Sequence, residues 1–377
     1  MSHQRTVNEM NRPCIWLSSV IRPKTRDFLL QRSFVFSSRT QNGQVGSRTH
    51  RSMSSNGDKP SSIEESVEAY YTQGDLWQRI SQALDALGYN NSPNRPLHPD
   101  DLAPLDEFHS RGRQGTIELC ELIKETSHCL DSSSTSSPSS SSSSSPLILD
   151  VGCGLGGTAR YLASVYGVHV TGIDLVHEYV VVGNELTRRV GGRRLAQQVT
   201  LQQASALHLP FGAATFDLVY TVHVQMNISD KVTFYQEMAR VVKTGGHVVF
   251  HDVFLGETAS AEDVRYPCPW AESQELSHLV TPSEMKELVR RRIPDLNVTA
   301  WHDMTNETIA SLERAVTQMT RRRRRPEQQQ DISNGISRRL GLHLVLGQTA
   351  VATKLKNHLH NCQTGRTVVG MGILTKM

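Results

Sequence analysis

The chain has 377 residues, of which 37% are hydrophobic and 20% charged, a composition typical of a globular protein that carries additional polar sequence. No stretch approaches the ~20 consecutive apolar residues that a transmembrane helix needs, so we expect no transmembrane segment. The net charge of +3 is the sum of a strongly basic segment, residues 1–53, and an acidic remainder. An acidic main body argues against a nucleic-acid partner.

Residues 1–60 are rich in Arg and Ser and poor in acidic residues, which is the composition of an organelle transit peptide. We therefore expect a disordered leader that directs the protein to a mitochondrion. A plastid or cytoplasmic location is the alternative, and a plain disordered tail is the other interpretation of this composition.

Helical periodicity begins after the leader and predicts an N-terminal helical cap over residues 61–130. Its helices are expected over residues 63–71, 76–87 and 114–125. The Pro-rich segment Pro93–Pro104 is expected to be a loop.

Two low-complexity segments interrupt the rest of the chain. Ser132–Ser145 is nearly pure serine, so we expect residues 131–146 to be a disordered insertion. Arg321–Arg325 is followed by Pro and a run of Gln, which predicts a second disordered insertion near residues 320–337. Docking of the arginine run on RNA or a membrane is less favoured than a solvated loop.

Strand-length apolar runs alternate with helical stretches over residues 147–377, the predicted main domain. The strands are expected at Leu147–Val151, Val168–Asp174, Val199–Gln203, Phe216–Thr221 and Gly246–Asp252, and the helices near Thr158–Tyr166, Glu178–Val190 and Lys231–Val242. This alternation predicts an α/β fold with a doubly wound, mostly parallel sheet that helices cover on both faces.

A glycine-rich turn follows the first predicted strand, with the sequence Asp150-Val-Gly152-Cys153-Gly154-Leu-Gly156. Glycine lets the backbone approach a ligand closely, but a G-x-G pattern alone also fits NAD-binding folds. The acid two residues before the first glycine discriminates, because a pyrophosphate gains nothing from a carboxylate there whereas the ammonium of S-adenosyl-L-methionine does.

A second acid stands at the carboxyl end of the next predicted strand. Asp174, followed by Leu175, lies about 20 residues after the glycine turn, which is the position of the ribose-hydroxyl acceptor in nucleotide-binding α/β folds. A helix N-cap is the alternative role for this aspartate alone. In register with the turn, we expect it to bind the cofactor.

The stretch Asp150–Asp252 resembles the core of class I S-adenosylmethionine-dependent methyltransferases, in the small-molecule (type 11-like) branch. The resemblance extends to Leu207–Phe211 with Phe216–Val219, and to the turn Ala239–Gly246. It implies a seven-stranded Rossmann-like sheet with a reversed last strand, S-adenosyl-L-methionine as cofactor, and methyl transfer to a small molecule.

Segments outside this core resemble the sarcosine/dimethylglycine methyltransferases of that branch: Tyr70-Tyr71, Asp106–His109, Pro267–Trp270 and Gly365–Gly372. The resemblance therefore implies N-methylation of a small amine such as sarcosine or dimethylglycine. C- or O-methylation of a prenylated quinone or phenol is the alternative. A non-catalytic cofactor-binding regulatory protein is the alternative of another class.

The resemblance also implies a set of site residues. The family usually has an acid after the third strand that accepts from the adenine amine; here Ser205 stands at that position, beside Ala206. His223, at the exit of the fourth strand, competes as a cofactor contact and a base, and His109 and His251 are further candidate bases.

Tyr70, Tyr71, Asn227 and Trp270 are the expected substrate-binding residues, with Trp270 suited to a methylammonium group. We expect no metal, because the six cysteines are scattered without a C-x-x-C pair. The expected partner is a small-molecule substrate, and a homodimer remains open.

Overall fold

The computed structural model describes residues 62–72, 74–89, 96–126, 130, 145–323, 332–333, 336–337 and 339–377. The predicted leader, nearly all of the predicted serine-rich insertion and much of the second insertion lie outside the described residues. Among the helices that are described, none is both long enough and apolar enough to cross a membrane.

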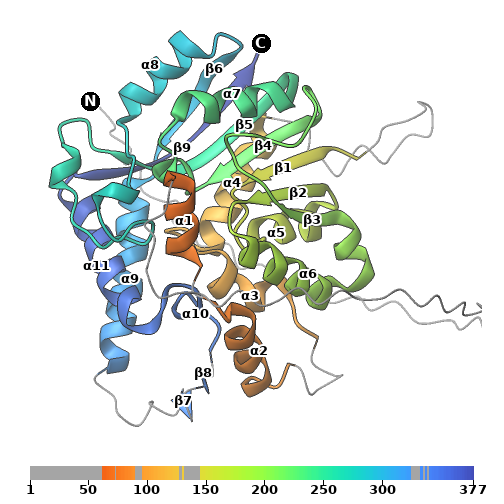
Figure 1. Ribbon diagram of the computed structural model, residues 1–377, viewed down its shortest axis with the longest axis vertical. Helices are drawn as coiled ribbons and strands as arrows, with labels where there is room; N and C mark the ends of the chain where they lie inside the picture. Colours follow the sequence, from red (N-terminus) through yellow and green to blue (C-terminus); the bar gives the residue numbers. More distant parts are fainter. Residues whose placement is uncertain are drawn as a thin grey trace, which may run out of the picture. The chain divides into compact units, whose positions relative to one another are not determined.

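Seven strands form one mixed sheet, in the order β3-β2-β1-β4-β5-β9-β6. Their bounds are β1 Leu147–Val151, β2 His169–Asp174, β3 Val199–Gln203, β4 Phe216–Val222, β5 Val242–Leu255, β6 Leu296–Asp303 and β9 Thr367–Lys376. The first five strands are parallel, and β9 runs antiparallel between β5 and β6 (Figure 1). The predicted seven-stranded, mostly parallel sheet with a reversed last strand is confirmed.

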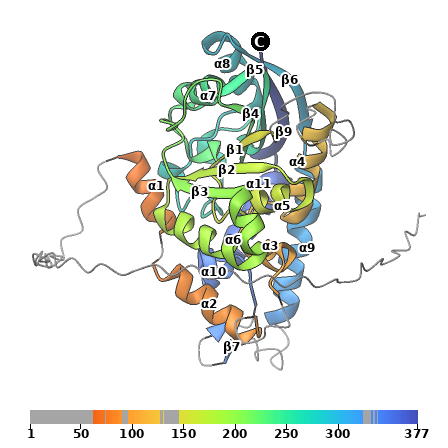
Figure 2. The same cartoon turned by 90° about the vertical axis from the view of Figure 1, so that its right-hand side faces the viewer.

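Helices cover both faces of this sheet because successive strand residues point to opposite sides. Ile148 and Leu149, neighbours in β1, belong to different buried clusters. The first cluster packs against α4 (Arg113–Thr126), α5 (Gly157–Tyr166) and part of α6 (His177–Gln198). The second packs against α7 (Lys231–Val241) and α8 (Pro282–Arg292), as the side view in Figure 2 shows.

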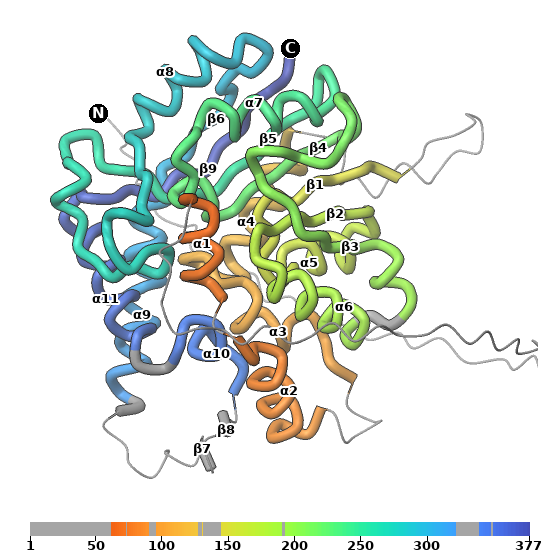
Figure 3. Tube along the Cα trace, in the orientation of Figure 1, coloured from red at the N-terminus to blue at the C-terminus, as the bar shows by residue number. Residues whose placement is uncertain are grey.

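Further helices surround the carboxyl ends of the parallel strands. They are α1 (Ile63–Tyr71), α2 (Leu76–Ala86), α3 (Pro99–Asp106), α9 (Thr305–Arg323), α10 (His343–Leu346) and α11 (Gln348–Gln363). The last three fill the connection between β6 and β9, together with the two-residue strands β7 (Ile332–Ser333) and β8 (Ile336–Ser337). The tube in Figure 3 shows α10 beside α2, two segments far apart in sequence that pack on each other.

Two predictions need correction. The segment Pro93–Pro104 is not all loop, because α3 begins at Pro99 and His98 caps it. Proline is tolerated at the first position of a helix, since the backbone N–H there has no partner within the helix. The second insertion, predicted near residues 320–337, overlaps a helix, since α9 continues to Arg323. Both errors arise because Pro and Arg runs were interpreted from composition, whereas the neighbouring apolar residues, such as Leu102 and Leu312, bind these helices to the body.

Candidate functional site

The turn after β1 has a backbone that only glycine adopts readily. Gly152 has φ +76° and Gly154 has φ +53°, both in the left-handed region. A Cβ atom on Gly152 would lie 2.2 Å from the Val224 side chain. The amides of Gly152 and Cys153 donate to the carbonyl of Ile173, which fixes the turn against β2 and leaves its outer side free to meet a ligand.

Two acids border this turn. Asp174 accepts hydrogen bonds from the amides of Gly154 (2.8 Å) and Val176 (2.9 Å), and burial nevertheless raises the pKa of its carboxyl to about 6. Asp150 accepts from the Tyr220 hydroxyl at 2.7 Å, and burial raises its pKa to about 7. Both carboxylates line one cavity at the carboxyl ends of the strands. A ligand with a positive charge or with hydroxyl groups would stabilise their ionised forms there and offset the cost of burying them.

The exit of β4 forms the opposite wall of this cavity. His223 has φ +55°, a left-handed conformation that costs a non-glycine residue ~1–3 kcal/mol. The neighbouring backbone holds it in place, because the amides of Val224 (2.9 Å) and Gln225 (3.0 Å) donate to the buried carboxylate of Asp252. The ammonium of Lys231 donates to the Gln225 carbonyl at 2.6 Å, so the loop is fixed from both sides.

Three histidine rings meet behind this loop. The ring centroids of His223 and His251 are 5.1 Å apart, and His109 lies 6.0 Å and 5.9 Å from them. Burial lowers the pKa of each ring, to about 4 for His109, where Arg113 and Arg111 add to the effect. Among the described residues no partner reaches Nε2 of His223, Nδ1 of His109 or either nitrogen of His251. Neutral imidazoles with unused nitrogens can accept protons.

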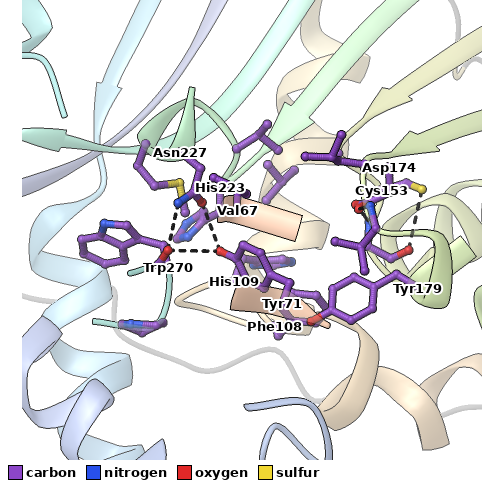
Figure 4. Close-up of a pocket in the computed structure, with 18 of the residues that line it drawn as sticks. Val67, Tyr71, Phe108, His109, Cys153, Asp174, Tyr179, His223, Asn227 and Trp270 are labelled. Carbon is purple, nitrogen blue, oxygen red and sulfur yellow. Dashed lines mark hydrogen bonds between the residues drawn. The ribbon is translucent and has the colours of Figure 1, made fainter. Parts of the chain in front are cut away.

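A network of hydrogen bonds closes the far end of the cavity (Figure 4). The Asn227 amide donates to the carbonyls of Trp270 (2.8 Å) and Leu276 (3.0 Å), and its oxygen accepts from the Tyr71 hydroxyl (3.0 Å). Trp270 donates through Nε1 to the Ser277 hydroxyl at 3.0 Å. These hydrogen bonds join α1, the loop after β4 and the segment around Trp270 at this end of the cavity.

Helices of the β6–β9 connection also line the cavity. Leu312 and Ala315 of α9, Leu346 of α10, and Leu355 and His358 of α11 all line the cavity. The ring of His358 packs edge-on against Trp270, with centroids 5.1 Å apart, and burial lowers its pKa to about 4. Sequence analysis missed these residues, although the spacing of Leu312 and Ala315 is helical.

Most of the predicted site residues line this cavity: Tyr71, His109, Asp150, Gly152, Cys153, Gly154, Asp174, Leu175, Ala206, His223, Asn227 and Trp270. Three predicted residues are not among those lining it. Gly156 is the N-cap residue of α5, and the Tyr70 hydroxyl donates to the carbonyls of Cys268 (3.2 Å) and Pro269 (3.1 Å). The hydroxyl of Ser205 donates to the carboxylate of Glu64. The structure thus brings most of the predicted set together, and their individual roles stay predictions.

The sheet order, the reversed β9 and the glycine turn after β1 define the class I fold of S-adenosyl-L-methionine-dependent methyltransferases. Residues 149–250 match the methyltransferase domain family, to which this segment belongs. The chain thus contains a methyltransferase domain of the class whose cofactor is S-adenosyl-L-methionine.

Curated relatives match a stretch of similar length. Chloroplastic tocopherol O-methyltransferase of Arabidopsis thaliana is 37% identical over 102 residues, covering 27% of this chain and 28% of the relative. The 2-methyl-6-phytyl-1,4-hydroquinone methyltransferase of Synechocystis is 40% identical over 105 residues, covering 28% of this chain and 31% of the relative. Each match therefore spans less than a third of the relative's own length.

A solved structure resembles a larger part of the fold. The protein of Galdieria sulphuraria named as a candidate sarcosine dimethylglycine methyltransferase has a TM-score of 0.54 at 14% identity. The likeness covers 78% of this chain and 97% of that one. At this identity the comparison establishes the fold alone.

The residues of the cavity fit this cofactor. Gly152 and Gly154 offer backbone that no Cβ covers, and Asp174 offers a carboxylate for ribose hydroxyls. Asp150 offers a second carboxylate toward an ammonium, and Leu175 and Ala206 offer apolar surface for a base.

Proposed function

We propose that this protein transfers the methyl group of S-adenosyl-L-methionine to a small, mostly apolar acceptor that carries a phenol or hydroquinone group. One observation carries the proposal: apart from the carboxylates, the cavity is lined mainly by apolar side chains and by histidines whose pKa burial lowers. Leu312, Leu346 and Leu355 supply apolar surface to this lining, and His223 lines the same cavity at the exit of β4.

The charge of this lining distinguishes the two kinds of acceptor. Sarcosine and dimethylglycine carry a carboxylate, and burying a carboxylate without a cation is costly. No Lys or Arg occurs among the described residues that line the cavity. The nearby Lys354 is engaged elsewhere, since its ammonium lies 2.7 Å from the Tyr70 hydroxyl and 3.3 Å from the Glu272 carboxylate. The lining therefore favours a quinone or phenol acceptor over the amino-acid amines.

Histidine supplies the base that such an acceptor needs. Bound S-adenosyl-L-methionine provides an activated methyl group on a positively charged sulfur. A phenol, with a pKa near ~10, must lose its proton as its oxygen forms the bond to that methyl group. Burial and the neighbouring His251 and His109 lower the pKa of His223, which keeps its imidazole neutral at pH 7 but makes it a weaker base than a free histidine. Its Nε2 has no partner among the described residues and is the atom we propose to take the proton as the methyl bond forms. Tyr71, Asn227 and Trp270 close the cavity against water.

The test is a methyl-transfer assay with labelled cofactor. We expect label in phenols or hydroquinones with apolar substituents, and none in sarcosine or dimethylglycine. Transfer to the amines alone would refute the proposed acceptor class. Binding of S-adenosylhomocysteine without turnover of any acceptor would favour the non-catalytic alternative.

A variant tests the proposed base. His223→Gln should lower kcat by ~10²–10⁴-fold, with affinity for S-adenosylhomocysteine changed by a few fold at most. The matched control is His302→Gln, on the exposed part of β6 outside the cavity, which should keep full activity. An active His223→Gln enzyme would eliminate this histidine as the base.

We also propose mitochondrial targeting by residues 1–60, which lie outside the described residues. The Arg-rich, acid-poor composition supports this. A reporter fused to these residues should enter mitochondria; a cytosolic or plastid signal would contradict the proposal.

A further inference from the structure

The helix α1 spans the cavity from one end to the other. Ile63, Glu64, Val67 and Tyr71 all line it, although no residue of the helix is fully buried. A helix of nine residues rises ~12 Å, enough to reach from the β3 side to the acceptor side. Its last turn contacts the acceptor end, where Tyr71 donates to Asn227. Its first turn therefore reaches a different part of the cavity.

That first turn lies at the carboxyl end of β3. The hydroxyl of Ser205, which follows β3, donates to Oε1 of Glu64. The same hydroxyl oxygen accepts from the amide of Leu207 at 3.0 Å, so the serine is fully engaged in holding the glutamate. Within the described part of the chain, no hydrogen bond reaches the second carboxylate oxygen of Glu64. This half-buried carboxylate thus presents a free acceptor to the cavity.

The position identifies what would meet this acceptor. In nucleotide-binding α/β folds the acid after β2, here Asp174, receives the ribose, so the base lies farther along, toward β3. The flanking Leu175 and Ala206 provide apolar surface for its ring faces. Adenine carries one exocyclic amine, N6, which donates hydrogen bonds and prefers a carboxylate partner.

The other carboxylates that line the cavity belong to α3, β1 and β2, and each has partners of its own, although Oδ1 of Asp106 accepts no hydrogen bond among the described residues. Asp106 pairs with Arg160 at 2.5 Å, Asp150 accepts from Tyr220, and Asp174 accepts from two backbone amides. We propose that Glu64 of α1 accepts a hydrogen bond from the adenine N6 amine, with Ser205 as its positioning residue. This inference rests on the proposed cofactor. In it, the first turn of α1 binds the adenine base and its last turn contacts the acceptor side of the cavity.

Calorimetry with two ligands tests it. S-adenosylhomocysteine carries the N6 amine, whereas S-inosylhomocysteine carries an oxygen there, which accepts rather than donates. The native protein should bind the adenosyl ligand about tenfold or more tightly. Glu64→Gln should shrink this preference several-fold, because a glutamine amide can donate to the inosine oxygen. Ser205→Ala should weaken adenosyl binding and leave inosyl binding unchanged.

The matched control is Glu65→Gln, which removes the same charge one residue away. Glu65 faces solvent and closes the capping box of α1 with Ser62, a role that glutamine also fills. This variant should keep the native preference. Equal preference in Glu64→Gln and the native protein would overturn the assignment of Glu64 while leaving the proposed function intact. Failure of the folded native protein to bind the adenosyl ligand would overturn both.

Discussion

His358, which lines the cavity, should make the stability of the protein depend on pH. Its ring is 1% exposed, its Nε2 lies 2.9 Å from the Ser110 hydroxyl, and burial lowers its pKa from 6.5 to about 4. Between pH 6.5 and about 4, His358 is mostly protonated in the unfolded chain and mostly neutral in the folded protein. The stabilising effect of the neutral ring is therefore fully present above pH 6.5 and is lost as the pH falls toward 4.

The magnitude follows from these two pKa values. Each pH unit between them removes ~1.4 kcal/mol, so lowering the pH from 7 to 5 should cost about 2 kcal/mol through this one ring. The raised pKa values of Asp150 and Asp174 act in the opposite direction, so the native slope alone does not isolate His358. A comparison with His358→Gln does, because the variant lacks this titration and keeps the others.

Urea unfolding at pH 7 and pH 5 is the assay. The stability difference between the native protein and His358→Gln should shrink by about 2 kcal/mol at the lower pH. Ser110→Ala is the control, since it removes the hydrogen-bond partner without removing a titrating group, and its cost should be the same at both pH values. Parallel losses in the native protein and His358→Gln would refute the buried, neutral histidine.

Two further predictions follow from the turn and the core. Gly154→Ala and Gly167→Ala both place an alanine in a left-handed conformation, so each should lower the free energy of unfolding by ~1–2 kcal/mol in thermal unfolding. Only Gly154→Ala should weaken S-adenosylhomocysteine binding in calorimetry, because nothing lies within 4 Å of a Cβ on Gly167. Equal affinities of the two variants would refute the assignment of the turn. Arg160→Met leaves the buried Asp106 carboxylate unpaired and should lower the free energy of unfolding by ~3–5 kcal/mol in urea. The double variant with Asp106→Leu should recover much of this loss. A double variant as unstable as Arg160→Met would contradict the ion-pair argument.

The sheet could be predicted because its strands carry local signals. Leu147–Val151 and Val199–Gln203 agree with the structure residue for residue, since short apolar runs end at glycine or polar turns. The glycine turn and Asp174 could be placed together because parallel strands share a carboxyl edge. These signals lie within a few residues of each other in the chain.

The rest of the site depends on contacts between distant segments. Ser205 was expected to meet the cofactor, but its hydroxyl turns to Glu64, 141 residues earlier, and no local pattern encodes that pairing. His251 joins His109 and His223 only because β4 and β5 are adjacent. The helices between β6 and β9 carry no motif, so their part in lining the cavity follows from tertiary packing alone.

The β6–β9 connection has one more consequence. Asp303 at the end of β6 pairs with Gly370 of β9, and the amide of Met304 donates to the Val369 carbonyl at 2.8 Å, so residues 304–366 leave and rejoin the sheet at neighbouring points. A segment anchored in this way can be exchanged for another of different length without altering the ladder. In the proposed arrangement, such an exchange would change the lining that meets the acceptor and leave Gly152, Asp174 and Ala206, which are proposed to meet the nucleoside, unchanged.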